Sequence, residues 1–150
     1  MIVSDRDRER LTWAIELGER CPRSATAFSV GAVITDSDGT ILATGFSRER
    51  DPRDHAEEGA LAKLDTDDPR LAQATLYSSL EPCSTRASRP RSCTELILAT
   101  AIPRVVFAWR EPTLFVDCEG AELLRVAGRE VVEISDLTDR VRRTNAHLLQ

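Results

Sequence analysis

Three side chains of types that bind zinc occur in one part of the chain. They are one histidine and two cysteines, His55, Cys83 and Cys93. Zinc binds imidazole nitrogens and thiolate sulfurs readily, and three protein ligands leave a fourth tetrahedral position open for water. An open position distinguishes a catalytic zinc site from a closed structural one. The sequence therefore predicts one catalytic Zn²⁺ held by these three residues.

Glu57 follows His55 by two positions and is the candidate catalytic group. On a regular helix this spacing turns two side chains about 200° apart, so Glu57 is not expected to share a ligand face with His55. Near the first turn of a helix its carboxyl group can still reach a water at the open position. A glutamate that is not a ligand can move protons between such a water and a substrate. We assign Glu57 this role.

Each of these motifs has a simpler explanation when it is taken alone. His-x-Glu occurs by chance on many solvent-facing helices, and two cysteines ten positions apart can be buried packing residues. The combination, in this order, favours a metal site over either explanation. Cys21 and Cys118 have no such context, and we expect them to be packing residues rather than members of a disulfide framework.

The predicted ligands lie at the ends of predicted elements. Glu81 precedes a proline and is held extended, so Cys83 should emerge at the end of a strand. Ser92 and Glu95 match a capping box, which places Cys93 at the first position of a helix, where the positive helix end favours a thiolate. Asp54 is expected to cap a helix that begins near His55. Ligands in these positions can converge.

The remaining pattern alternates strands with helices. Strands are predicted at 30–34, 41–46, 74–80, 105–109 and 130–134, and helices between Ser4 and Pro22 and at 55–64, 93–99, 120–127 and 136–148. The first two strands are joined by a turn at 36–39 and should form an antiparallel hairpin. Such alternation favours a three-layer α/β/α domain, with a mixed sheet of about five strands and helices on both faces.

Composition limits the classes of function. The 150 residues are expected to form a single domain, 1–150. Twenty basic and twenty-five acidic residues give a net charge of −5, which argues against a nucleic-acid surface and favours a small-molecule substrate. The amino terminus turns charged after three residues, and no apolar run approaches the ~18 residues of a membrane span. We therefore expect a cytoplasmic protein without a membrane partner.

Residues 80–84 (Leu-Glu-Pro-Cys-Ser) and Cys93, preceded by His55-Ala56-Glu57, resemble the cytidine deaminase-like zinc hydrolase superfamily. Nine residues separate the two cysteines, a gap longer than in most nucleoside, nucleotide and tRNA deaminases and similar to that of the pyrimidine deaminase domain of riboflavin biosynthesis. The resemblance implies the three-layer fold, a Zn²⁺ cofactor, hydrolytic release of ammonia with Glu57 as the proton shuttle, and a homo-oligomer, in the simplest case a dimer.

The resemblance also indicates residues that bind substrate. Gly31 falls where the superfamily brings a strand close to the substrate base, although a strand glycine can also mark a bulge. Phe28 and Ser29 stand where riboflavin-type deaminases have Asn-Pro, so Phe28 is expected either to stack on the base or to pack in the core. Within the arginine-rich segment 84–91, Arg89 is the first choice for a phosphate ligand, the alternative being a solvated loop.

Three functions are consistent with these patterns. The first is a deaminase of an aminopyrimidine nucleotide-like molecule, as in riboflavin biosynthesis. The second is a cytosine nucleoside or nucleotide deaminase of the cytidine or dCMP type. The third is a non-catalytic, zinc-stabilised binding protein, which would require a fourth protein ligand to block the open zinc position.

Overall fold

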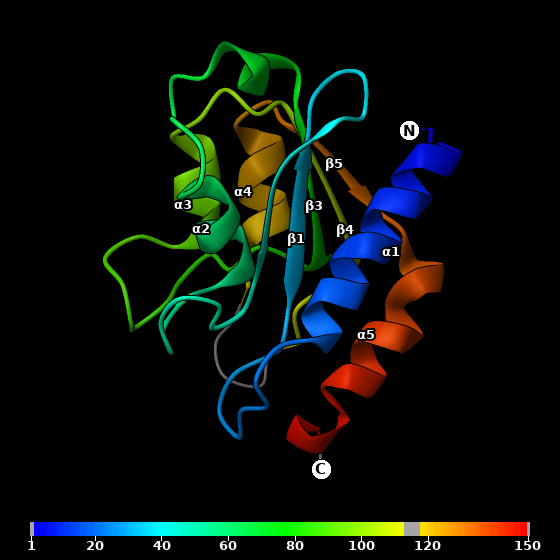
Figure 1. Ribbon diagram of the computed structural model, residues 1–150, viewed down its shortest axis with the longest axis vertical. Helices are drawn as coiled ribbons and strands as arrows, with labels where there is room; N and C mark the ends of the chain where they lie inside the picture. Colours follow the sequence, from blue (N-terminus) through cyan, green and yellow to red (C-terminus); the bar gives the residue numbers. More distant parts are fainter. Residues whose placement is uncertain (1, 113–117, 150) are drawn as a thin grey trace.

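The computed structural model describes residues 2–112 and 118–149, which contain one five-stranded mixed sheet. The strands lie in the order β2-β1-β3-β4-β5 (Figure 1). Strand β1 pairs antiparallel with β2 and with β3, whereas β3, β4 and β5 run parallel. Their bounds are β1 (Gly31–Thr35), β2 (Ile41–Phe46), β3 (Thr75–Leu80), β4 (Arg104–Trp109) and β5 (Glu130–Glu133). The predicted mixed sheet and its amino-terminal hairpin are confirmed.

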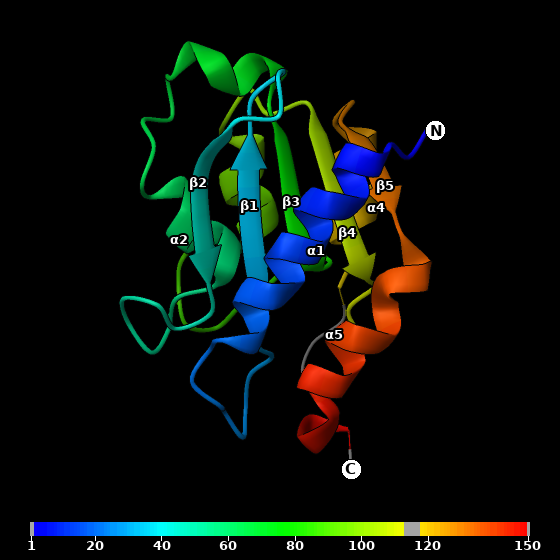
Figure 2. The same cartoon turned by 45° about the vertical axis from the view of Figure 1, so that its right-hand side comes forward.

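Helices cover both faces of the sheet. Helices α1 and α5 lie on one face and α2, α3 and α4 on the other, as Figures 1 and 2 show from two directions. Their bounds are α1 (Asp5–Glu19), α2 (Ala56–Leu61), α3 (Cys93–Leu98), α4 (Gly120–Val126) and α5 (Thr138–Thr144), with short 3-10 turns at Pro69–Gln73, Ser135–Leu137 and Ala146–Leu148. The predicted three-layer α/β/α fold is confirmed. In the described ranges, no helix is long and apolar enough to cross a membrane.

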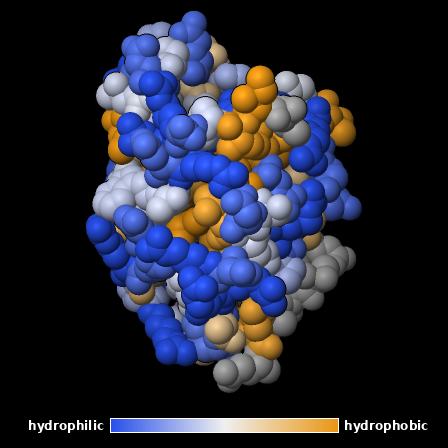
Figure 3. Space-filling model, turned by 90° about the vertical axis from the view of Figure 1, so that its right-hand side faces the viewer, coloured by the Kyte–Doolittle hydropathy of each residue, from blue (hydrophilic) through white to orange (hydrophobic). Residues whose placement is uncertain are grey.

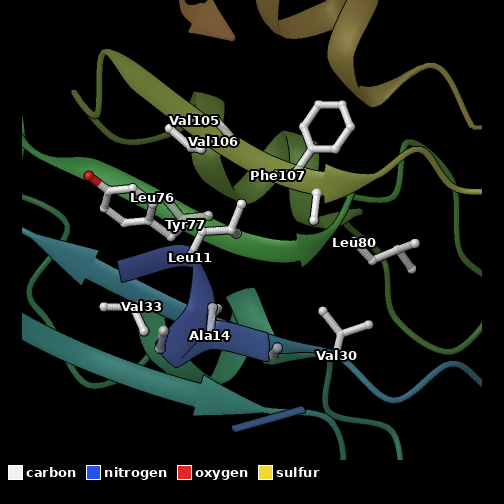
Figure 4. Close-up of a cluster of buried hydrophobic side chains, with 14 of the residues drawn as sticks. Leu11, Ala14, Val30, Val33, Leu76, Tyr77, Leu80, Val105, Val106 and Phe107 are labelled. Atoms are coloured by element: carbon white, nitrogen blue, oxygen red, sulfur yellow. The ribbon is translucent and has the colours of Figure 1, made fainter. Parts of the chain in front are cut away.

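The core lies where α1 crosses the central strands. Leu11 and Ala14 of α1 are fully buried against side chains of β1, β3 and β4 (Figure 4). Strands β3 and β4 are buried along almost their whole length, as parallel strands covered on both faces should be. On the side of the molecule that carries α1 and α5, hydrophilic side chains surround separate, smaller apolar patches (Figure 3).

Two glycines allow helices to approach the sheet closely. A Cβ atom at Gly31 would overlap the backbone of Ala14 and Gly18 in α1. Gly31 therefore permits a close approach of α1 to β1, and its expected contact with a substrate stays a prediction. A Cβ atom at Gly45 would overlap the backbone of Ala56 and Ala60. Gly45 thus lets α2, whose first turn follows His55, lie tightly on β2.

Two helix boundaries differ from the sequence predictions because side chains have other partners. Helix α2 is capped by His55 rather than by Asp54, whose carboxylate is buried and accepts hydrogen bonds from Arg50. The predicted helix 136–148 begins at Thr138 and is broken at Asn145. Its predicted cap, Asp136, pairs with Arg8 at 2.7 Å instead.

A buried ion cluster joins α1 to the sheet. The Asp7 carboxylate, 4% exposed, accepts hydrogen bonds from the Tyr77 hydroxyl (2.7 Å) and from both terminal nitrogens of Arg104 (2.7 and 2.8 Å). Burial acts to raise the pKa of Asp7, but the hydrogen bonds from Arg104, Ser4 and Tyr77 outweigh it and hold that pKa well below its usual value. The charged carboxylate therefore stabilises the contact of α1 with β3 and β4.

Asp7→Asn should lower the free energy of unfolding by about 3 kcal/mol, because removing one partner leaves the other charge of a buried pair uncompensated. Urea denaturation at neutral pH measures this. A depressed folded-state pKa contributes stability above the unfolded-state pKa of about 4, and this contribution is lost as the pH falls further. The difference between the wild type and Asp7→Asn should therefore shrink below about pH 4.

Asp136→Asn is the matched control, because Asp136 forms its ion pair with Arg8 on the surface. It should leave the unfolding midpoint unchanged, since exposed ion pairs contribute little. Equal midpoints for Asp7→Asn and Asp136→Asn would contradict the assignment of a stabilising role to the buried cluster.

Candidate active site

The three predicted zinc ligands meet at one point. His55 directly precedes α2, Cys83 follows the end of β3, and Cys93 is the first residue of α3. The Nδ1 atom of His55 lies 3.5 Å from the sulfur of Cys83 and 3.4 Å from that of Cys93. All three ligand atoms lie within 4.8 Å of one another. Tetrahedral Zn–S and Zn–N bonds place sulfur and nitrogen about 3.6 Å apart, so this donor set fits a zinc ion.

The first turn of α3 organises the two cysteines. Ser92 and Glu95 form the predicted capping box, with reciprocal hydrogen bonds of 3.1 Å. The helix therefore begins at Cys93, whose peptide N–H donates to the sulfur of Cys83 at 3.2 Å. The next peptide, that of Thr94, donates to the carbonyl oxygen of Cys83 at 3.0 Å. These bonds hold Cys83 against the helix start and favour its thiolate form.

The protonation states of the ligands suit a cation. A hydrogen bond from the Cys93 thiol lowers the pKa of Cys83 to about 4, and donating that bond raises the pKa of Cys93. Burial acts to lower the pKa of His55, but its contact with the Cys83 thiolate raises the pKa overall. Both thiols must lose their protons when a metal ion binds, and the low pKa of Cys83 favours that loss.

Glu57 lies beside the ligands in the same cavity. Its carboxyl group is buried, and one oxygen accepts a hydrogen bond of 3.2 Å from the Ser78 hydroxyl. Burial and the nearby charge of Cys83 raise the pKa of Glu57 to about 7. Because His55 is the cap of α2 rather than part of it, the regular helical angle does not separate the two side chains. The carboxyl group of Glu57 therefore lies beside the ligands, as its predicted role in proton transfer requires.

A cavity of ≈ 370 Å³ opens in front of the ligands. This volume is in the range of sites for small molecules. Its wall includes Phe28, whose ring packs edge-on against Trp109 with centroids 5.7 Å apart. The other chemically important residues of the wall are Arg48, Arg53, His55, Glu57, Cys83, Arg86 and Glu111.

The other predicted substrate-binding residues lie outside this wall. Arg89 faces carboxylates: it pairs with Asp54 at 3.3 Å and with Glu58 at 3.2 Å. Its neighbour Arg86 lines the cavity instead, with a side chain only 3% exposed and a terminal nitrogen 3.2 Å from Glu58. Ser29 likewise lies behind the wall, where its hydroxyl accepts a hydrogen bond of 2.7 Å from Arg48. The structure therefore brings Phe28 to the cavity, but not Ser29, Gly31 or Arg89.

Glu111 is a cavity residue that the sequence patterns did not identify. Among the described residues, its buried Oε2 atom has no hydrogen-bond partner that meets the geometric criteria, and burial raises the pKa of this carboxyl group to about 7 although an interaction with the Cys118 thiol acts to lower it. The buried Glu81 carboxylate fixes its position by accepting hydrogen bonds from the peptides of Glu111 (3.1 Å) and Ala121 (3.0 Å). One signal was available: Glu111 follows β4 as Cys83 follows β3, and the carboxyl ends of parallel strands meet at one edge.

The remaining cysteines are not part of the ligand group found among the described residues. Cys21 contacts the carbonyl oxygen of Val30 at 3.5 Å, and Cys118 contacts that of Pro82 at 3.3 Å. Both are partly buried, as expected of packing residues. Segment 47–54, which precedes His55, contributes Arg48 and Arg53 to the cavity wall.

Comparison with known proteins places these features in context. The curated diaminohydroxyphosphoribosylamino-pyrimidine deaminase of Schizosaccharomyces pombe is 43% identical over 127 residues, covering 83% of this chain and 31% of the relative. The crystal structure of a diaminohydroxyphosphoribosylaminopyrimidine deaminase/5-amino-6-(5-phosphoribosylamino)uracil reductase from Thermotoga maritima superposes with a TM-score of 0.79 at 34% identity, covering 91% of this chain and 38% of that one.

The fold also occurs in a smaller deaminase. The Aspergillus oryzae Rib2 deaminase, crystallised as a C-terminal deletion mutant in complex with DARIPP, superposes with a TM-score of 0.73 at 22% identity, covering 96% of this chain and 98% of that one. By contrast, the chain spans only 31% of the length of the Schizosaccharomyces pombe deaminase and 27% of the riboflavin biosynthesis protein RibD of Aquifex aeolicus.

The family model that matches the chain is described as the cytidine and deoxycytidylate deaminase zinc-binding region, and it covers residues 4–109. This description confirms the zinc cofactor predicted from the sequence. Because the match spans more than half of the chain and includes the converging histidine and cysteines, the chain belongs to the family defined by the cytidine and deoxycytidylate deaminase zinc-binding region.

Proposed function

We propose that this chain is a zinc-dependent hydrolytic deaminase of an aminopyrimidine nucleotide-like molecule, of the kind used in riboflavin biosynthesis, and that it releases ammonia. The observation that carries the proposal is a buried carboxyl group, Glu57, beside three convergent zinc ligands in a cavity sized for a small molecule. The similarity to pyrimidine deaminases at 43% and 34% identity supports this choice of substrate over cytidine or dCMP.

His55, Cys83 and Cys93 are the proposed zinc ligands, and Glu57 is the proposed proton shuttle. When bound, zinc acts as a Lewis acid and lowers the pKa of a water molecule to about 7, which supplies the nucleophile at neutral pH. Glu57 takes up one proton of the water and delivers it to a ring nitrogen, and it then carries the remaining hydroxyl proton to the amino group. A ring nitrogen must accept a proton during attack, and the amino group leaves as ammonia only after protonation. One buried carboxyl group with a pKa near neutrality suits both steps.

Glu111 is the proposed recognition group for the pyrimidine. Its buried Oε2 atom, which has no hydrogen-bond donor of good geometry within residues 2–112 and 118–149, can accept a hydrogen bond from an amino group or a ring N–H of the substrate. Phe28 offers an aromatic surface in the same wall. Arg86 lines the cavity and is the better-placed candidate for a substrate phosphate, whereas the predicted contact of Arg89 would require that side chain to leave Asp54 and Glu58. Several other expectations remain proposals that rest on the sequence. They are the phosphate contact of Arg89, the direct roles of Ser29 and Gly31, the single domain 1–150, the homodimer and the cytoplasmic location.

The purified protein should contain one zinc per chain, measured by atomic emission. Cys83→Ala and Cys93→Ala should each release it, because two protein ligands do not hold zinc against dialysis. Cys118→Ala is the matched control and should keep it, since Cys118 is not part of the ligand group. Zinc should also be lost as the pH falls, because imidazole and thiolates must be deprotonated to bind. Full occupancy in either ligand variant would refute the assignment.

Glu57→Gln should keep its zinc and lose activity. The amide preserves shape but cannot exchange a proton, so kcat for ammonia release should fall at least ~10²-fold, the lower range for general acid–base catalysis. Glu16→Gln, a half-buried position of α1 outside the active-site cavity wall, is the control and should retain wild-type kcat. A Glu57→Gln protein that deaminates at nearly the wild-type rate would exclude Glu57 as the shuttle.

Glu111→Gln should distinguish the substrate classes. Loss of a hydrogen bond to a charged group corresponds to roughly 1.5–3 kcal/mol, so kcat/KM for the diaminohydroxyphosphoribosylaminopyrimidine should fall about 10- to 100-fold with zinc retained. The wild type should prefer this compound to cytidine and dCMP. If Glu111→Gln lowered kcat/KM equally for all three, the role of Glu111 would be structural. If the wild type preferred dCMP, the second candidate function would replace the first.

A further inference from the structure

One wall of the cavity lacks regular secondary structure. Residues 22–29, here called the 22–29 loop, connect α1 to β1 and contribute Thr26, Ala27 and Phe28 to the cavity. No helix or sheet ladder fixes this loop. Its position must therefore depend on hydrogen bonds from side chains elsewhere in the chain.

Arg48 supplies most of these bonds on the cavity side. Its Nε and Nη2 atoms donate to the carbonyl oxygen of Pro22 at 3.1 and 2.7 Å. Its Nη1 atom donates to the carbonyl oxygen of Phe28 at 3.1 Å, and Nη2 also donates to the Ser29 hydroxyl at 2.7 Å. A single guanidinium group thus joins the start of the loop to its end. Four of its five N–H groups are used within the protein, which leaves little capacity for a substrate.

The backbone of Arg48 ties the same residue to the metal-binding segment. Its φ of 61° lies in the left-handed region, which a side chain other than glycine rarely adopts. Its peptide N–H donates to the carbonyl oxygen of Asp54 at 2.8 Å, and Asp54 directly precedes His55. Arg48 therefore links the 22–29 loop to the residue that begins the ligand set.

The carboxyl-terminal segment holds the loop from the opposite side. The buried Asn145 amide accepts a hydrogen bond from the peptide N–H of Ser29 (2.7 Å) and donates to its carbonyl oxygen (3.2 Å). His147 donates to the carbonyl oxygen of Ser24 at 2.7 Å. These contacts form the base of the loop, whereas Arg48 itself lines the cavity. Phe28, between the two groups of contacts, is placed with its ring edge-on to Trp109.

We propose that Arg48 is a positioning residue of the substrate cavity: by joining Pro22, Phe28 and Ser29 it holds the 22–29 loop in place and thereby sets the strength of substrate binding. This inference rests on the proposed deaminase function for its kinetic consequence. Its structural consequence, the position of Phe28 against Trp109, can be measured without a substrate.

The test uses Arg48→Met, which keeps side-chain length and removes every donor. Arg10→Met is the matched control, because Arg10 also donates two bonds to a backbone carbonyl, that of Gly39, but does not line the active-site cavity. Both are made in a Trp13→Phe background, so that Trp109 is the only tryptophan of the chain.

With the diaminohydroxyphosphoribosylaminopyrimidine as substrate, Arg48→Met should raise KM about tenfold or more and change kcat less than about threefold. The emission of Trp109 should shift in Arg48→Met and not in Arg10→Met.

Arg48→Lys separates positioning from direct attraction of an anionic substrate. Lysine keeps the charge but cannot join Pro22, Phe28 and Ser29 at once, so it should behave like methionine in both measurements. Full rescue of KM by lysine, or a raised KM with unchanged Trp109 emission, would assign Arg48 to direct substrate contact and overturn the proposal. Unchanged KM and unchanged emission would overturn it as well.

If Arg48→Met does not fold, Arg48→Gly replaces it, because glycine adopts the left-handed conformation without strain and also lacks the donors. If the wild type releases no ammonia from any aminopyrimidine or cytosine compound, the proposed function fails, and the Trp109 emission still decides whether Arg48 positions the loop. An unchanged emission in that case refutes the positioning role by itself.

Discussion

The structure depends on the need of two buried cysteines and one imidazole for a shared cation. Their ligand atoms lie within 4.8 Å of one another, and thiolates this close repel each other unless a positive charge lies between them. Three elements must end at this point for the site to exist. Strand β3 ends at Leu80 just before Pro82 and Cys83, the Ser92 capping box begins α3, and Gly45 lets α2 approach β2. The need to bring the three ligands together explains the local sequence at each of these positions.

The grouping of these buried ligands also explains the raised pKa values of the carboxyl groups around them. Burial raises the pKa values of both Glu57 and Glu111 to about 7, and the charge of Cys83 contributes to each shift. A divalent cation at the ligands would lower both values, which would favour the charged carboxylate form of Glu57 that accepts a proton. The arginines near the cavity do not supply this charge freely, because Arg86 pairs with Glu58 and Arg89 with Asp54 and Glu58. Their pairing therefore limits the net positive charge that these two arginines bring to this part of the molecule.

The parts of the fold and site that sequence patterns predict are those set by neighbours along the chain. The capping box before Cys93, the position of Cys83 at a strand end and the alternation of strands and helices are local features, and each is found as predicted. Contacts between distant segments account for the rest. Gly31 accommodates α1, Arg89 is drawn to Asp54 and Glu58, and Asn145 breaks the last helix where its amide binds Ser29. Glu111 lines the cavity because β4 runs parallel to β3, and this pairing joins segments that are distant in the sequence.

Hydrolytic deamination by the zinc-loaded chain is the central claim, and the origin of the oxygen in the product tests it most directly. The zinc-loaded protein would be incubated with the diaminohydroxyphosphoribosylaminopyrimidine in water enriched in heavy oxygen, and the pyrimidine and ammonia would be quantified by mass spectrometry and a coupled assay. We expect one solvent oxygen in the pyrimidine for each ammonia released, because the amino group is replaced by a hydroxyl group derived from water. Full recovery of unlabelled pyrimidine without ammonia, from protein that retains its zinc, would contradict the account.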